Sequence, residues 1–142
     1  MPSPSEIHRA YVDSINSRDW DRLTSLIHPD YSYTGTDGNT MPGGPAAGVA
    51  IAKMFVDAID ARIDIVHAHE SANTSVIEFN GTGTHIGDFL GVAPTGKPLS
   101  AKVCDVIEVR DGLVYREREY FDVLGLMVQL GAIPDPMAAA AH

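Results

Sequence analysis

Apolar residues follow a helical spacing in three segments of the N-terminal half. The first segment runs to about residue 16 and can be capped by Ser3 or Ser5. The second is short, can be capped by Asp19, and must end before Pro29. The third has apolar residues at positions 51, 54, 55, 58 and 59, with aspartates on the opposite side. The pattern therefore predicts three helices.

Beyond these segments the spacing of apolar residues changes to the alternation that is typical of strands. Strands are predicted at about residues 63–70, 75–88, 99–110 and 113–122, and residues 31–36 alternate like a further short strand. Asp111-Gly112 between two alternating runs predicts a hairpin with a type I′ turn. Residues 40–48 have the Gly- and Pro-rich composition of a mobile loop. Helices followed by a run of antiparallel strands predict an α+β fold.

Length and charge narrow the class of protein. The 142 residues fit one domain, 1–142, with an ordered core at about 4–133 and a flexible tail at 134–142. A net charge of −9 argues against nucleic acid or an anionic membrane as partner, and no apolar run is long enough for a membrane span. The polar residues Glu6, His8 and Arg9 stand where a signal peptide would be apolar, so we expect a cytoplasmic protein.

Several short motifs carry a resemblance to a known family. They are Gly-Thr-His-Ile-Gly-Asp-Phe-Leu-Gly at 83–91, Pro-Thr-Gly-Lys at 94–97, Val-Arg-Asp-Gly at 109–112, Leu-Gly-Leu at 124–126 and Gln-Leu-Gly at 129–131. Together they resemble the SnoaL-like polyketide cyclase family of the nuclear transport factor 2-like superfold, over nearly the whole chain. The resemblance implies a cone-shaped, curved antiparallel or mixed sheet that wraps around the N-terminal helices and leaves an apolar cavity. Residues 119–122 also resemble the strand end of limonene-epoxide-hydrolase-type members of the superfold.

The predicted hairpin indicates which side chains share the cavity. If it is regular, Asp105 lies opposite Arg118, and both share a face with Tyr120 and Asp122. We take this as the cavity face, because the resemblance transfers the family's general-base position to Asp122. Arg118 can pair with Asp105 and fix the register, or it can bind a substrate oxygen. A β-bulge would shift the phase, and this alternative stays open.

Three residues are candidates for catalysis. Asp122 would remove a proton from an activated carbon or activate water; its structural alternative is to cap a turn or helix that begins at Leu124. His85 could donate a hydrogen bond or shuttle a proton, or be a satisfied histidine at the rim of the sheet. Asp88 stands where epoxide hydrolases carry one of two paired aspartates, and it lines the cavity together with His85 only if Gly87 marks a bulge.

The remaining site candidates are expected to contact substrate. They are Tyr11, Tyr33, Met54, Phe55, Asp105, Arg118 and Tyr120. His67 and His69 share a strand face without a third ligand at suitable spacing, so we predict no metal site. No nucleotide, haem or cysteine-nucleophile motif occurs, and we expect no cofactor.

These patterns and the resemblance together predict a function. We expect a cofactor-free acid–base enzyme that acts on a hydrophobic carbonyl compound, most concretely by intramolecular aldol closure of a polyketide. The alternatives are an epoxide hydrolase with an Asp-activated water and a non-catalytic module that binds a small molecule. The expected partners are a small hydrophobic ligand and a second copy of the chain, bound through the outer face of the sheet.

Overall fold

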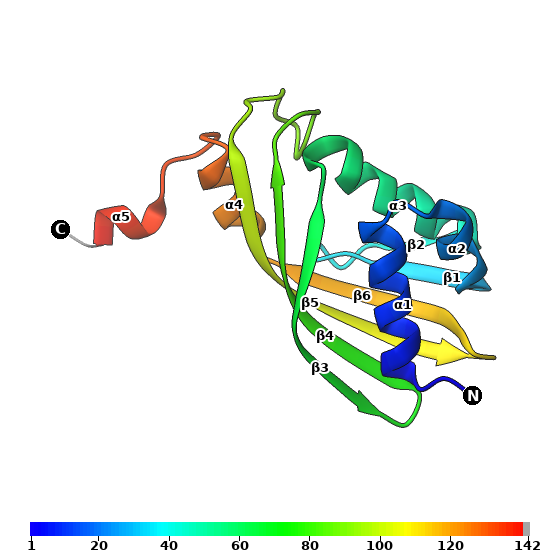
Figure 1. Ribbon diagram of the computed structural model, residues 1–142. Coiled ribbons are helices and arrows are strands. Elements are labelled where there is room, and N and C mark those ends of the chain that lie inside the picture. Colours follow the sequence, from blue (N-terminus) through cyan, green and yellow to red (C-terminus); the bar gives the residue numbers. More distant parts are fainter. Residues whose placement is uncertain (141–142) are drawn as a thin grey trace.

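The computed structural model describes residues 1–140 and has an α+β architecture. Helices α1, α2 and α3 and a six-stranded sheet form its body, and α4 and α5 follow the sheet (Figure 1). The elements are α1 Pro4–Asn16, α2 Trp20–Ser25, β1 Ile27–Thr34, β2 Thr40–Pro42, α3 Gly44–Ile59, β3 Arg62–Ser71, β4 Thr74–Thr84, β5 Pro98–Arg110, β6 Leu113–Phe121, α4 Val123–Gln129 and α5 Pro136–Ala140.

The N-terminal helices begin at the predicted caps. The hydroxyl of Ser3 accepts a hydrogen bond from the backbone of α1, and the carboxylate of Asp19 accepts one from the backbone of α2. Two boundaries differ from the prediction. Strand β1 begins at Ile27 rather than at about residue 31, and residues 40–48 form β2 and the start of α3 rather than a loop. Pairing of β2 with β1 orders a segment whose composition alone indicates a loop.

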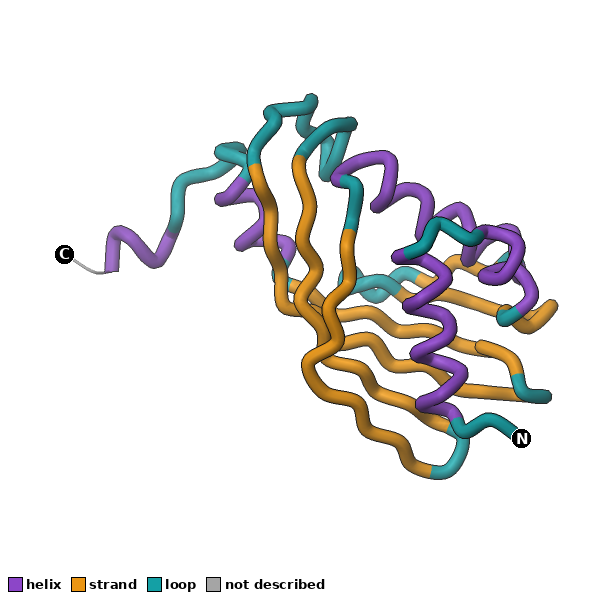
Figure 2. The backbone as a smooth tube through the Cα atoms, viewed as in Figure 1, coloured by secondary structure: helices purple, strands orange, loops and turns teal. Residues whose placement is uncertain are grey.

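The sheet has the strand order β2-β1-β6-β5-β4-β3. Its neighbouring strands are antiparallel except β1 and β6, which are parallel, so the sheet is mixed. Strands β3, β4 and β5 bend strongly, and the concave side of the sheet holds α1 and α3 (Figures 1 and 2). The curved sheet around the N-terminal helices confirms the predicted fold class.

A bulge in β6 changes which side chains reach this concave side. Next to the turn, Val109 pairs with Val114 as predicted, but from Glu108 onward the partners are shifted by one residue, so Asp105 pairs with Glu119. Tyr115 is the extra residue, and the guanidinium carbons of Arg110 and Arg116 lie 3.9 and 5.0 Å from the centre of its ring. The predicted pairing of Asp105 with Arg118 is therefore wrong.

Strand β4 ends at Thr84, earlier than predicted, because its end meets the C-terminal turn of α3. A Cβ atom at Gly83 would lie 2.2 Å from the backbone oxygen of Ile59, and one at Gly87 would lie 2.6 Å from that of Asp57. These glycines permit a close approach of helix and strand. Gly87 therefore serves helix packing rather than a strand bulge.

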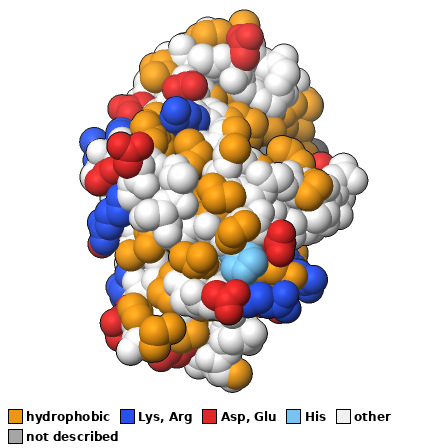
Figure 3. Space-filling view, turned by 90° about the vertical axis from the view of Figure 1, so that its right-hand side faces the viewer, with side chains coloured by type: hydrophobic (Ala, Val, Ile, Leu, Met, Phe, Trp, Pro, Cys, Tyr) orange, Lys and Arg blue, Asp and Glu red, His pale blue; other side chains and the backbone are white. Residues whose placement is uncertain are grey.

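The surface gives no test of the expected dimer. On the face shown in Figure 3, hydrophobic side chains are interspersed with polar and charged ones. No helix within residues 1–140 has the length and apolar character of a membrane span. Pairing of two copies through the outer sheet face stays a prediction.

Residues 134–140 include the short helix α5, which extends away from the body in Figure 1.

Candidate active site

A pocket lies between the concave side of the sheet and the helices α1 and α3. Its empty volume is about 920 Å³ when the part that opens to solvent is counted. Most of its lining is apolar, with Phe55 and Ile59 from α3, Phe79 from β4, Phe121 from β6 and Leu126 from α4. The pocket therefore suits a hydrophobic organic ligand.

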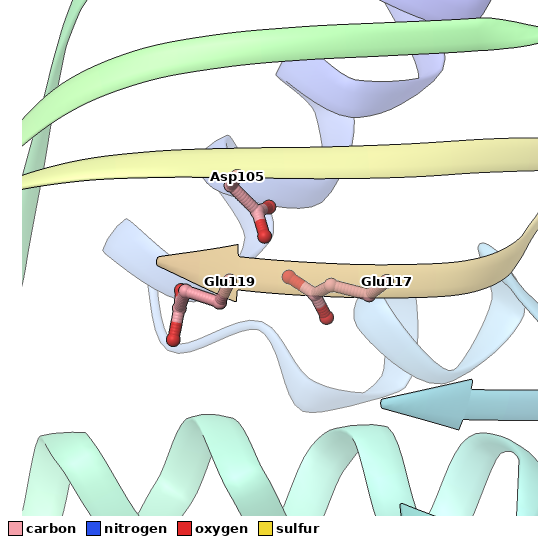
Figure 4. A group of neighbouring side chains, drawn as sticks. All are labelled: Asp105, Glu117 and Glu119. Carbon is pink, nitrogen blue, oxygen red and sulfur yellow. The ribbon is translucent and has the colours of Figure 1, made fainter. Parts of the chain in front are cut away.

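Three carboxylic acids stand together in this apolar lining: Asp105 on β5, and Glu117 and Glu119 on β6 (Figure 4). One carboxyl oxygen of each lies within 4.8 Å of the others. Asp105 and Glu119 face each other across the two strands, an arrangement of like charges that destabilises a sheet. A buried acidic cluster that opposes stability is a candidate for function.

Tyrosine hydroxyls hold two of the three acids. Tyr11 from α1 and Tyr31 from β1 both donate to Oε1 of Glu117, at 2.8 and 2.6 Å. Tyr33 donates to Oε1 of Glu119 at 2.9 Å. All three contacts cross from one element to another, so the fold fixes the position of both glutamates.

The third acid is held by a histidine. His8 is fully buried on α1, and its Nε2 lies 2.8 Å from Oδ2 of Asp105. On the other side of the ring, Nδ1 lies 2.9 Å from the hydroxyl of Ser75 on β4. The other oxygen of Asp105, Oδ1, is buried and has no donor in the described chain. Asp105 thus belongs to a buried polar chain that crosses the core.

Burial dominates the electrostatics of the cluster. It raises the pKa of Glu119 from 4.5 to about 8, whereas the bond from Tyr33 opposes the shift. Burial, together with the charge of Glu119, likewise raises the pKa of Asp105 above its ordinary value. Burial lowers the pKa of His8 to about 4, so this histidine is neutral at neutral pH. The site therefore contains carboxyl groups that exchange protons near neutral pH.

The same three acids are the group within residues 1–140 whose spacing could hold a metal ion. Carboxylate oxygens suit hard cations such as Mg²⁺ and Ca²⁺. However, both tyrosine hydroxyls on Glu117 already use its Oε1, and the surrounding wall is mainly apolar. Acid–base chemistry on an organic ligand is the better match to this donor set.

Four of the residues predicted to contact substrate lie in this pocket: Tyr11, Tyr33, Phe55 and Asp105. The other three lie outside its lining. Met54 is 54% exposed and Tyr120 is 50% exposed. Arg118 points to the outer face of β6, where it forms an ion pair with Glu108 at 2.9 Å. The bulge explains why Arg118 and Tyr120 face away from the pocket. Met54 projects from the solvent side of α3.

None of the three predicted catalytic residues lines the pocket. Asp122 is exposed and accepts a hydrogen bond from the backbone of Gly125 at 2.8 Å, so it caps α4. His85 is buried in the loop after β4, where Nδ1 contacts Thr95 and Nε2 lies 3.2 Å from the carbonyl of Val92. Asp88 is exposed in the same loop. The prediction that these side chains face the cavity is wrong, because β4 ends early and β6 is shifted by the bulge.

Sequence reasoning missed four residues of the cluster: His8, Tyr31, Glu117 and Glu119. His8 had a usable signal, because it lies three and seven residues before Tyr11 and Ile15 and therefore on the buried stripe of α1. The two glutamates follow from the alternation in β6 once the bulge is known. Tyr31 lies in a predicted strand, but the alternation there does not assign it to the site.

Several proteins are similar to this chain in amino-acid sequence. Residues 5–130 match the family described as SnoaL-like polyketide cyclase. The aklanonic acid methyl ester cyclase AcmA of Streptomyces galilaeus is 32% identical over 127 residues, which are 87% of each chain. The nogalonic acid methyl ester cyclase of Streptomyces nogalater is 25% identical over 122 residues, 84% of this chain and 91% of that protein.

The likeness extends to solved structures. AclR of Streptomyces galilaeus superposes with a TM-score of 0.83 at 22% identity, covering 97% of this chain and 88% of the other. At this identity the likeness concerns the fold alone. Together with the sequence matches it leads to one conclusion. The chain belongs to the SnoaL-like polyketide cyclase family.

Proposed function

We propose that this protein is a polyketide cyclase that closes a ring by an intramolecular aldol reaction, with Glu119 as the general base. The observation that carries the proposal is the pair of Asp105 and Glu119 in an otherwise apolar pocket. Two relatives are named as methyl ester cyclases, one of aklanonic acid and one of nogalonic acid. A neutral ester fits an apolar pocket that already contains acidic groups better than a free carboxylate would.

The reaction needs one proton to be moved twice. Glu119 takes the proton from a carbon that lies between two carbonyl groups, and the resulting enolate carbon attacks a ketone of the same molecule. A carbon–carbon bond forms, the electron pair of the ketone π bond moves to its oxygen, and Glu119 returns the proton to that alkoxide. The product is an isomer of the substrate, and the pocket contributes by holding the reacting carbons close together.

Glu119 suits this role better than its neighbours. It is less deeply buried than Asp105 and Glu117, and one tyrosine, Tyr33, donates to it. A pKa of about 8 lies close to the pH at which the protein would work and allows the carboxyl group to take up and release a proton. Asp122 is not carried into the proposal, because it is exposed and bound to the backbone of α4.

The test compares the wild type with two variants, with aklanonic acid methyl ester as the substrate and product formation as the readout. We expect Glu119→Gln to lose about 10²–10⁴-fold in kcat/KM. Asp122→Asn, which keeps a side chain suited to a helix cap, should retain the wild-type rate. Full activity of Glu119→Gln would overturn the assignment, as would loss of activity in Asp122→Asn with an intact fold.

The two alternatives give different outcomes. Epoxide opening would incorporate labelled oxygen from water into a diol, whereas the aldol reaction leaves the composition of the substrate unchanged. A binding module would bind the ester tightly without converting it, in the wild type as well as in Glu119→Gln. Either result would replace the cyclase proposal.

A further inference from the structure

One buried oxygen atom in the acidic cluster has no donor. Oδ1 of Asp105 is buried, and none of the described backbone or side-chain groups donates a hydrogen bond to it. The residue is 4% exposed. Leaving a buried carboxylate oxygen without a donor costs free energy, so native structures rarely do so. A proton on a neighbouring group would satisfy this atom.

The proton does not come from Asp105 itself, because Oδ2, its other oxygen, already accepts a hydrogen bond from His8. Ser75 is fully buried, and the ring of His8 is its only side-chain partner in the described chain. The Ser75 hydroxyl must therefore donate to Nδ1 of His8, or its hydrogen would be buried without an acceptor. A neutral ring that accepts at Nδ1 carries its hydrogen on Nε2, which then donates to Oδ2 of Asp105.

The neighbouring group that remains is Glu117. Two tyrosine hydroxyls donate to its Oε1, which leaves its second oxygen free. Figure 4 shows the carboxyl groups of Asp105 and Glu117 pointing toward one another, whereas that of Glu119 points away toward α3. We propose that Glu117 is a neutral carboxylic acid at neutral pH and that it donates its proton to Oδ1 of Asp105.

This assignment satisfies the whole chain of polar groups. Ser75 donates to His8, His8 and Glu117 each donate to Asp105, and Tyr11 and Tyr31 donate to Glu117. The titratable groups around Glu117 are His8 and Tyr11 on α1, Tyr31 and Tyr33 on β1, Asp105 on β5 and Glu119 on β6. The cationic neighbours on β6 are Arg116 and Arg118, which line a separate surface hollow with Glu117, and Arg118 is paired with Glu108 there. Burial, followed by the charge of Asp105, raises the pKa of Glu117 well above its ordinary value, which agrees with the assignment.

The consequence for the reaction rests on the proposed function. Because Asp105 and Glu119 repel each other, only one of them is readily ionised near neutral pH. Two donors on Asp105 make it the anion, and its charge then opposes ionisation of Glu119. Glu117 is thus a positioning residue. It acts on the general base through Asp105 and does not touch the reacting atoms.

Glutamine at position 117 is the discriminating substitution, because it has the shape and the hydrogen-bonding pattern of the neutral acid. Its carbonyl can accept from both tyrosines while its amide donates to Oδ1 of Asp105. We expect Glu117→Gln to keep about the wild-type kcat/KM and the same pH at which activity rises. Glu117→Leu, which lacks the donor, should shift that pH and lower the rate. Loss of activity in Glu117→Gln as large as in Glu119→Gln would overturn the proposal.

Infrared spectroscopy tests the proton directly and needs no substrate. At neutral pH Glu119→Gln, which lacks the other carboxyl group that can be protonated there, should show one absorption band of a protonated carboxyl group that shifts in heavy water. The band should be missing when Glu117→Gln is added to this variant. Its absence from Glu119→Gln, or its survival in the double variant, would disprove the protonation whatever the reaction is. Full activity of Glu119→Gln would instead disprove the proposed function and leave the band unaffected.

Discussion

Replacing Glu119 by glutamine should make the stability of the protein less dependent on pH. Burial raises the pKa of this carboxyl group from 4.5 to about 8 in the folded protein. In the unfolded chain the group has its ordinary pKa. Between these two values the folded protein holds a proton that the unfolded chain has released. The stability gained from the neutral acid is complete below the ordinary pKa and is lost as the pH rises through the folded value.

The size of the effect follows from the length of that pH window. One unit of pKa difference corresponds to about 1.4 kcal/mol. From about pH 6 to about pH 8, where the folded pKa lies, the wild type should therefore lose up to about 3 kcal/mol that the variant keeps. This figure is an upper limit, because Asp105 titrates together with Glu119 and takes part of the change.

Urea unfolding at about pH 6 and about pH 9 measures this loss for each protein. Glu108→Gln is the matched control, because it removes a half-buried carboxylate from the outer face of the adjoining strand. The free energy of unfolding should fall more steeply with pH in the wild type and in Glu108→Gln than in Glu119→Gln. Equal slopes in all three proteins would refute the argument that Glu119 is buried with a raised pKa.

Three further substitutions test other parts of the structure. Tyr33→Phe removes the donor that lowers the pKa of Glu119, so the rise of kcat/KM should move to higher pH in a pH–rate profile. Gly83→Ala places a Cβ against the backbone of α3 and should cost about 1–3 kcal/mol in urea unfolding, whereas Gly81→Ala on the same strand has room and should cost less. Asp122→Ala should lower stability by about 1 kcal/mol through loss of the α4 cap, with an unchanged pH–rate profile.

Most of the fold could be predicted because its signals are local. The spacing of apolar residues in α1, the caps at Ser3 and Asp19, and the turn at Asp111-Gly112 all depend on neighbouring residues. Asp111 and Gly112 have φ angles of 55° and 72°, as the type I′ turn requires. These features therefore follow from the sequence without knowledge of the rest of the chain.

The face of β6 could not be predicted, because the bulge depends on contacts beyond the hairpin. The backbone N–H of Val114 donates to the carbonyl of Leu26, and that of Val109 donates to Asn73. These bonds attach the end of the hairpin to other segments, and the shift at Tyr115 follows next to them. A shift of one residue turns Arg118 and Tyr120 outward and Glu117 and Glu119 inward.

The bulge also explains why only part of the site could be predicted from the sequence. Tyr11, Tyr33, Phe55 and Asp105 lie in the pocket as predicted, because the faces of their helices and strands do not depend on the bulge. The catalytic assignment to Asp122 relied on a family position, and the bulge had altered the phase at that end of β6. His8 needed a three-dimensional argument as well, because its partners on β4 and β5 are distant in the sequence.

Carbon-detected NMR titration of the Glu119 carboxyl group tests the central claim most directly. The signal can be assigned by its loss in Glu119→Gln, and no substrate is needed. The account predicts a pKa of about 8, which would identify a desolvated acid–base group in the pocket. A pKa near 4.5 would contradict it, because the carboxylate would then be hydrated and unsuited to the proposed exchange of protons.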